Sequence, residues 1–282
     1  MWPEKIFCHC ANIMLSNVGN MTIENRTGKP WARYEYILVL NQYMKMPFGK
    51  MHRSNAEIIA LASLMKRTPD SVAMRLVNFA ACDPVLASRS IKGLPGGKKQ
   101  CMPYWEEFCN DRESLMFESE KILAQLQNTS IEDKYREVLD LTKDLRGDTK
   151  ERVVKTRVNQ NVFRQMILSL YDNRCALTGI NEQELLLASH IKPWAVDQKN
   201  RLNPKNGICL SALYDRAFDK GLIGFDGHYR VVLSQRLKEH NREDYYQQYF
   251  GCIDGKTLNV PYEDYKPELE FLEYHMDCIF LR

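Results

Sequence analysis

The sequence predicts an α+β protein, in which a mainly helical N-terminal domain precedes a C-terminal module of two strands, one helix and an extra β-hairpin. Three observations lead to this prediction. Helix-capping signals recur between residues 31 and 80. An apolar run at 185–188 is followed by an Asn-Gly turn and a second apolar run. Asp226-Gly227 then separates the apolar stretches 222–225 and 228–233, which is a strong hairpin signal.

Three helices are expected in the N-terminal domain. Residues 31–43 carry apolar and aromatic side chains at helical spacing. Ser54 to Glu57 is a capping box for a second helix that ends near residue 65, and Thr68 followed by Pro69 caps a third. The second and third helices predict a helix-turn-helix-like arrangement, whose expected DNA contacts are Arg67, Ser71, Arg75 and Asn78. A small helical scaffold with a solvated basic face is the alternative.

Charge is distributed unevenly along the chain. Residues 26–105 contain thirteen Lys and Arg against four Asp and Glu, whereas residues 106–150 contain seven against twelve. A basic segment of this kind is typical of a protein that binds a polyanion. We therefore divide the chain into an N-terminal tail (1–25), a basic helical, DNA-binding-like domain (26–105), an acidic helical connector (106–150) and a C-terminal domain (151–282).

Three other segments complete this division. The glycine-containing basic stretch 92–99 is expected to be a flexible loop, either a wing along a DNA backbone or a plain linker. The connector should contain amphipathic helices at about 105–127 and 131–145. A helical segment near residues 269–276 is expected to pack on the C-terminal module, but its sequence does not indicate a role.

Asp215 and Asp219 form a candidate cation site. They lie four residues apart, so on a helix they share one face and repel each other. Gly221 is a natural residue just beyond a helix end, which puts Asp219 in the last turn, where the helix dipole also disfavours negative charge. A bound Mg²⁺ or Mn²⁺ would offset both penalties, because hard ions prefer oxygen ligands. Two solvated surface acids are the alternative.

His190 is a candidate general base. It ends the apolar run, and a neutral imidazole with a pKa of about 6.5 can accept a proton from water near neutral pH. The alternative is a hydrogen-bonded core histidine without a chemical role.

These residues resemble the HNH nucleases of the ββα-metal superfamily. The resemblance begins at residues 157–164, passes through Tyr171 and the stretch 175–179, and ends near residue 225. It implies that His190 is the general base and that Asn206 braces the loop holding it. It also implies that Asp215 is a metal ligand and that Asp219, by similarity to the colicin-type members, is a second.

Two departures define the chain as an H-N-D variant of that pattern. Many members have Asp immediately before the base, where this chain has Ser189, and many have His as the last motif residue, where it has Asp215. The resemblance is closest to restriction-type and other defence nucleases of bacteria and phages. Lys192 and Arg216 lie within the motif and are either phosphate contacts or ordinary solvated side chains.

Cysteine usage and hydropathy exclude several classes. The nine cysteines include no C-x-x-C pair, so no structural zinc is expected, and unpaired cysteines indicate a reducing, cytoplasmic compartment. No stretch of eighteen apolar residues is present, so no membrane span is expected. Residues 1–14 do not resemble a secretion signal.

The sequence therefore predicts a metal-dependent HNH endonuclease that acts on double-stranded DNA in restriction or anti-phage defence. A homodimer is the simplest way to cut both strands. Two alternatives stay open: a DNA-binding regulator with a degenerate nuclease module, and an effector nuclease activated by a nucleotide or a partner through residues 1–150.

Overall fold

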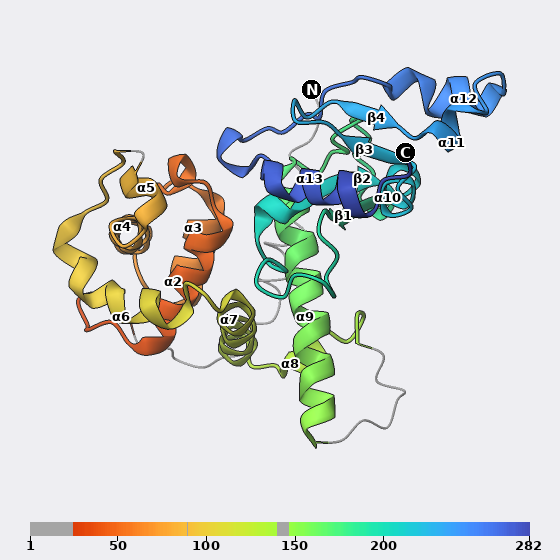
Figure 1. Ribbon diagram of the computed structural model, residues 1–282. Helices are drawn as coiled ribbons and strands as arrows, with labels where there is room; N and C mark the ends of the chain where they lie inside the picture. Colours follow the sequence, from red (N-terminus) through yellow and green to blue (C-terminus); the bar gives the residue numbers. More distant parts are fainter. Residues whose placement is uncertain (1–24, 89, 140–146) are drawn as a thin grey trace, which may run out of the picture. The chain divides into compact units, whose positions relative to one another are not determined.

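The computed structural model describes residues 25–88, 90–139 and 147–282, which form two compact units (Figure 1). The first is Met1–Val158 and the second is Asn159–Arg282. The predicted tail at 1–25 lies outside the described residues except for its last position, as do residues 140–146 of the predicted connector. Helices and two small sheets give an α+β fold, and no described helix has the length and hydropathy needed to cross a bilayer.

The first unit is helical. Its helices are α2 (Arg33–Lys45), α3 (Ala56–Leu64), α4 (Pro69–Ala80), α5 (Pro84–Ser88), α6 (Lys98–Phe108), α7 (Arg112–Leu126) and α8 (Ile131–Lys134). Thr68 caps α4 as predicted, because its side chain accepts a hydrogen bond from Ser71 N and Pro69 occupies the first helical position. Helix α4 contacts α2, α3 and α6, and Figure 1 shows it in the middle of the unit with these helices around it.

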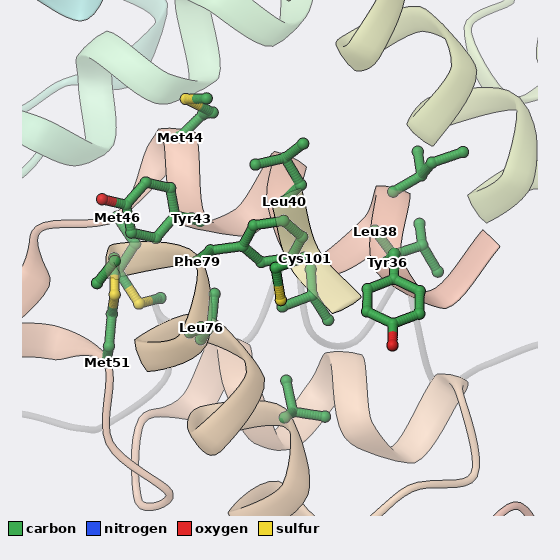
Figure 2. Close-up of a cluster of buried hydrophobic side chains, with 14 of the residues drawn as sticks. Tyr36, Leu38, Leu40, Tyr43, Met44, Met46, Met51, Leu76, Phe79 and Cys101 are labelled. Carbon is green, nitrogen blue, oxygen red and sulfur yellow. The ribbon is translucent and has the colours of Figure 1, made fainter. Parts of the chain in front are cut away.

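The hydrophobic core of this unit lies between α2, α4 and α6. Leu40, Leu76, Phe79 and Cys101 are completely buried there, and Figure 2 shows them gathered with Tyr43. Burial of each large apolar side chain stabilises the fold by about 1.5–3 kcal/mol. The buried side chains of α4 therefore pack against α2 and α6 in one core.

The acidic connector differs from its prediction. The helix expected at 105–127 is divided, because α6 ends at Phe108 and the Asp111 side chain caps the start of α7 by accepting a hydrogen bond from Ser114 N. The helix expected at 131–145 is the short α8, and turns follow it up to residue 139.

The second unit contains the strands. Helix α9 (Gly147–Leu170) includes the division between the units and is followed by β1 (Leu186–His190) and β2 (Gly207–Ser211), an antiparallel pair. The remaining elements are α10 (Ala212–Asp219), β3 (Ile223–Phe225), β4 (Val231–Leu233), α11 (Gln235–Lys238), α12 (Asp244–Tyr249) and α13 (Leu269–Cys278). Helix α10 packs on both strands of the first pair.

Two turns of this unit follow from single residues. Gly221 ends α10 with φ of +66°, and the amides of Gly221 and Leu222 bond to the carbonyls of Phe218 and Ala217, as predicted for a glycine beyond a helix end. The predicted hairpin is confirmed as β3 and β4, but its loop is longer than two residues, since Asp226 N bonds to Arg230 O.

Candidate functional site

His190 lies at the end of β1, directly opposite Gly207 of β2. Its ring stacks on Phe163 of α9, with ring centroids 3.9 Å apart and planes 17° apart. Trp194 approaches with its ring nearly perpendicular, at 5.4 Å. Two aromatic side chains therefore restrict the orientation of the imidazole.

One hydrogen bond determines which nitrogen of His190 can act as a base. Nε2 lies 2.9 Å from the backbone carbonyl oxygen of Arg201, which can only accept, so Nε2 carries the hydrogen and donates it. Nδ1 is then the basic nitrogen of the neutral ring. It has no hydrogen-bond partner among the described residues and is not one of the fully buried polar atoms. Burial lowers the pKa of His190, which keeps the ring neutral near pH 7.

Gly207 makes the stacking of His190 possible. A Cβ at this position would lie 2.5 Å from Cδ1 of Ile167 and 2.6 Å from Cζ of Phe163. Real Cβ atoms do not approach other atoms so closely, so α9 packs against the ribbon only because residue 207 lacks a side chain. The predicted Asn-Gly turn is wrong, because Gly207 is the extended first residue of β2 and its role is close packing.

Asn206 holds the loop between β1 and β2. Its side chain is completely buried, and Oδ1 accepts a hydrogen bond of 2.8 Å from Lys192 N. Nδ2 donates to the carbonyl oxygens of Lys192 and Asn200, each at 3.2 Å. One amide therefore satisfies three backbone groups in the loop that also carries Trp194 and the Arg201 carbonyl.

The two carboxylates of α10 lie close to β1. Ser189 Oγ donates a 2.5 Å hydrogen bond to Asp215 Oδ1, and consecutive Cα atoms are about 3.8 Å apart, so the Cα of His190 lies within roughly 9 Å of that carboxylate. Partial burial and then the negative charge of Asp215 raise the pKa of Asp219. Adjacent residues of β1 thus connect the ribbon to two different helices, α9 through His190 and α10 through Ser189.

The donor set of α10 fits a hydrated divalent cation. Asp215 and Asp219 repel each other, and neither forms an ion pair with another described residue. No group of three or more His, Cys, Asp or Glu side chains in the described residues could hold a metal. Two carboxylates suit Mg²⁺ or Mn²⁺, because Mg²⁺ keeps several waters and takes its remaining ligands from substrate phosphate.

Lys192 and Arg216 differ in their surroundings. Lys192 Nζ lies 2.8 Å from Glu270 Oε1, and this hydrogen bond raises the pKa of Lys192. The same ammonium lies over the rings of Phe271 and Tyr274 of α13. To contact a phosphate, Lys192 would have to give up its ion pair with Glu270. Arg216 is exposed and has no ion-pair partner among the described residues.

Helix α13 contributes a residue that sequence reasoning missed. His275 is 1% exposed, stacks flat on Phe218 at 3.8 Å and donates from Nε2 to the Phe218 carbonyl oxygen at 3.0 Å. Burial lowers its pKa to about 4. His275 therefore fixes the last turn of α10, next to Asp219. Its partner lies 57 positions away, so no local pattern could indicate it.

The structure contradicts the predicted DNA contact of Arg67. Its side chain is 3% exposed and forms two hydrogen bonds to Glu35, at 2.7 and 2.9 Å. Although burial alone would raise the pKa of Glu35, these bonds and one from Ala32 N hold it below its ordinary value. A guanidinium in the core cannot reach a groove, so its charge stabilises the unit internally.

The other three predicted contacts of α4 are also engaged within the unit. The guanidinium of Arg75 lies over the rings of Trp31 and Tyr36, at 4.6 and 4.9 Å. Asn78 is buried and donates to a backbone carbonyl, and the hydroxyl of Ser71 donates to Thr68 O. The exposed side chains of α4 are instead those of Asp70 and Met74, an acidic and an apolar residue.

Comparison with known proteins identifies one region. Residues 175–226 match the family model described as HNH endonuclease. This match contains β1, β2, α10 and β3, and with them His190, Asn206 and both carboxylates. No curated protein matches the chain.

Proposed function

We propose that this chain, whose residues 175–226 belong to the HNH endonuclease family, is a metal-dependent nuclease that hydrolyses phosphodiester bonds in double-stranded DNA. The observation that carries the proposal is the state of His190. Its Nε2 is committed to the Arg201 carbonyl, so the neutral ring presents Nδ1 as a base. A restriction or anti-phage role is the biological setting that we infer from the sequence resemblance.

The residues of the ribbon would perform the proton transfer. Nδ1 of His190 takes a proton from water as the water oxygen bonds to phosphorus and the bond to the leaving 3′ oxygen breaks. Phe163 and the Arg201 carbonyl keep the ring in the orientation and tautomer that this transfer needs. Asn206 maintains the loop that supplies the carbonyl. Arg216, whose side chain is exposed, would contact backbone phosphate.

The carboxylates of α10 would hold the divalent ion. Asp215 would be the first ligand and Asp219 the second, and His275 would hold the last turn of the helix, which carries Asp219. When bound, the ion supplies Lewis-acid polarisation of the phosphoryl oxygen and neutralises charge at the leaving oxygen.

A second function is favoured by one contact. The Ser189 hydroxyl occupies one oxygen of Asp215, at a position where many members have an aspartate ligand. A DNA-binding regulator with a degenerate nuclease module would show this kind of loss. Replacing Ser189 by Asp distinguishes the two, because it restores cutting only if the module is degenerate.

Plasmid cleavage in Mg²⁺, Mn²⁺ or EDTA tests the proposal. We expect the parent protein to cut with either metal and not in EDTA, and His190→Ala and Asp215→Ala to lose cutting while their circular dichroism is unchanged. Matched controls are His228→Ala and Asp254→Ala, whose exposed side chains lie outside the site. Equal cutting by His190→Ala would overturn the proposal, and cutting that requires a cell extract or a nucleotide would indicate an activated effector.

A further inference from the structure

Five of the thirteen basic residues in 26–105 form ion pairs inside the first unit. Ion pairs with carboxylates involve Arg26, Arg33, Lys45, Arg53 and Arg67. Three lysines of one short segment are different: Lys92, Lys98 and Lys99 are exposed and have no ion-pair or ring partner among the described residues. We call residues 92–99 the lysine loop. The lysine loop therefore carries three exposed positive charges that no carboxylate of the described residues neutralises.

The lysine loop is attached firmly to α4. Leu94 N donates to Val77 O at 3.2 Å, and Asn78 Nδ2 donates to Leu94 O at 3.0 Å. A Cβ at Gly93 would lie 2.5 Å from Val77 O, and one at Gly97 would lie 2.1 Å from Asn78 Oδ1. The two glycines thus let the loop lie directly on the helix. The expectation of a flexible loop is wrong for this segment, because its backbone is anchored by hydrogen bonds and by close packing.

We propose that the lysine loop binds the phosphodiester backbone of the nucleic acid on which the C-terminal module acts. This inference rests on the proposed function. A lysine ammonium is a compact point charge suited to phosphate, so three of them on one loop fit a polyanion of regular charge spacing. Because the loop is already ordered, binding would cost little conformational entropy.

The position of two of these lysines gives the proposal a second, independent readout. Lys98 and Lys99 occupy the first turn of α6. That turn contains no acidic residue. Cations are unfavourable there, because the helix dipole is positive at its N-terminus. Replacing them should therefore leave the thermal stability unchanged or raise it, although it weakens binding. A structural role for these side chains would produce the opposite result.

The experiment compares the parent protein with a triple variant, Lys92→Gln with Lys98→Gln and Lys99→Gln. Binding to a fluorescent DNA duplex is measured in EDTA at several salt concentrations, so that cleavage does not contribute. We expect the affinity of the triple variant to fall at least about tenfold, and the slope of log affinity against log salt to become shallower by roughly one for each lysine. Lys121→Gln, an exposed lysine on α7, is the matched control.

Two outcomes separate this inference from the proposed function. If the triple variant binds the duplex with parental affinity and salt slope, the lysine loop does not bind nucleic acid, whether or not the protein cuts. If the parent binds and never cuts, but the triple variant loses binding, the inference stands and the proposed function fails. A duplex RNA of the same length, measured in parallel, shows which nucleic acid the loop prefers.

Discussion

Replacing Asn206 by alanine should release the loop between β1 and β2. The change removes the acceptor of Lys192 N and the donor to two carbonyls, and the Asn206 side chain that makes these bonds is completely buried. A buried polar group that loses its partner costs about 1–3 kcal/mol. Because water can reach parts of this loop, we expect a total loss of about 3 kcal/mol in the free energy of unfolding of the C-terminal unit.

Hydrogen exchange at the Lys192 amide tests this prediction directly. A loss of about 3 kcal/mol should speed exchange by roughly a hundredfold if the loop opens with its unit. Asn206→Asp is the informative companion variant, because it keeps an acceptor for Lys192 N but turns an oxygen toward two carbonyl oxygens. Its Lys192 amide should stay better protected than in Asn206→Ala. Parental exchange in the alanine variant, with less than about 1 kcal/mol lost in urea denaturation, would refute the reasoning.

Four further predictions concern single residues. Gly207→Ala should cost about 1–3 kcal/mol in calorimetry by displacing Phe163, and parental stability would contradict the packing argument. Arg67→Ala should lower the stability of the N-terminal unit by about 3 kcal/mol, since Glu35 stays buried, and a stable variant that only loses DNA binding would contradict this. The pKa of His275 is lowered in the folded protein, so as the pH falls the unfolded chain is protonated before the folded one. The free energy of unfolding should therefore decrease from pH 6.5 toward pH 4. His275→Gln should weaken this pH dependence, as measured by urea denaturation at each pH. The pKa of His190 is also lowered, so the acid limb of the cleavage rate should lie below pH 6.5, and a rate already falling at pH 7.5 would contradict its role as base.

Features set by neighbouring residues could be predicted from the sequence. Thr68 caps its helix because the hydroxyl reaches an amide three positions away, and Gly221 ends α10 because a glycine tolerates positive φ. The apolar runs at 185–188 and 208–210 indicate two strands, although their pairing as β1 and β2 joins residues 17 to 25 positions apart. Caps and turns depend on residues only a few positions apart, so the sequence alone is enough to predict them.

Features set by distant partners could not be predicted. The residues next to Arg67 predict an exposed basic side chain. In the structure the side chain is buried, because it bonds to Glu35, 32 positions earlier. His275 and Phe218 are farther apart still, and Gly93 has its meaning only because Val77 lies against it. The identity of these residues is compatible with several environments. Only the tertiary packing selects one.

The central claim is that the base and the divalent ion face the same phosphodiester. Its most direct test is the distance from bound Mn²⁺ to the imidazole nitrogens of His190, measured by paramagnetic relaxation of ¹⁵N-labelled histidine with Asp215→Ala as the blank. We predict a distance within about 10 Å, which a hydrated ion and one phosphate can span. A distance well above that, or relaxation that persists in Asp215→Ala, would contradict the account.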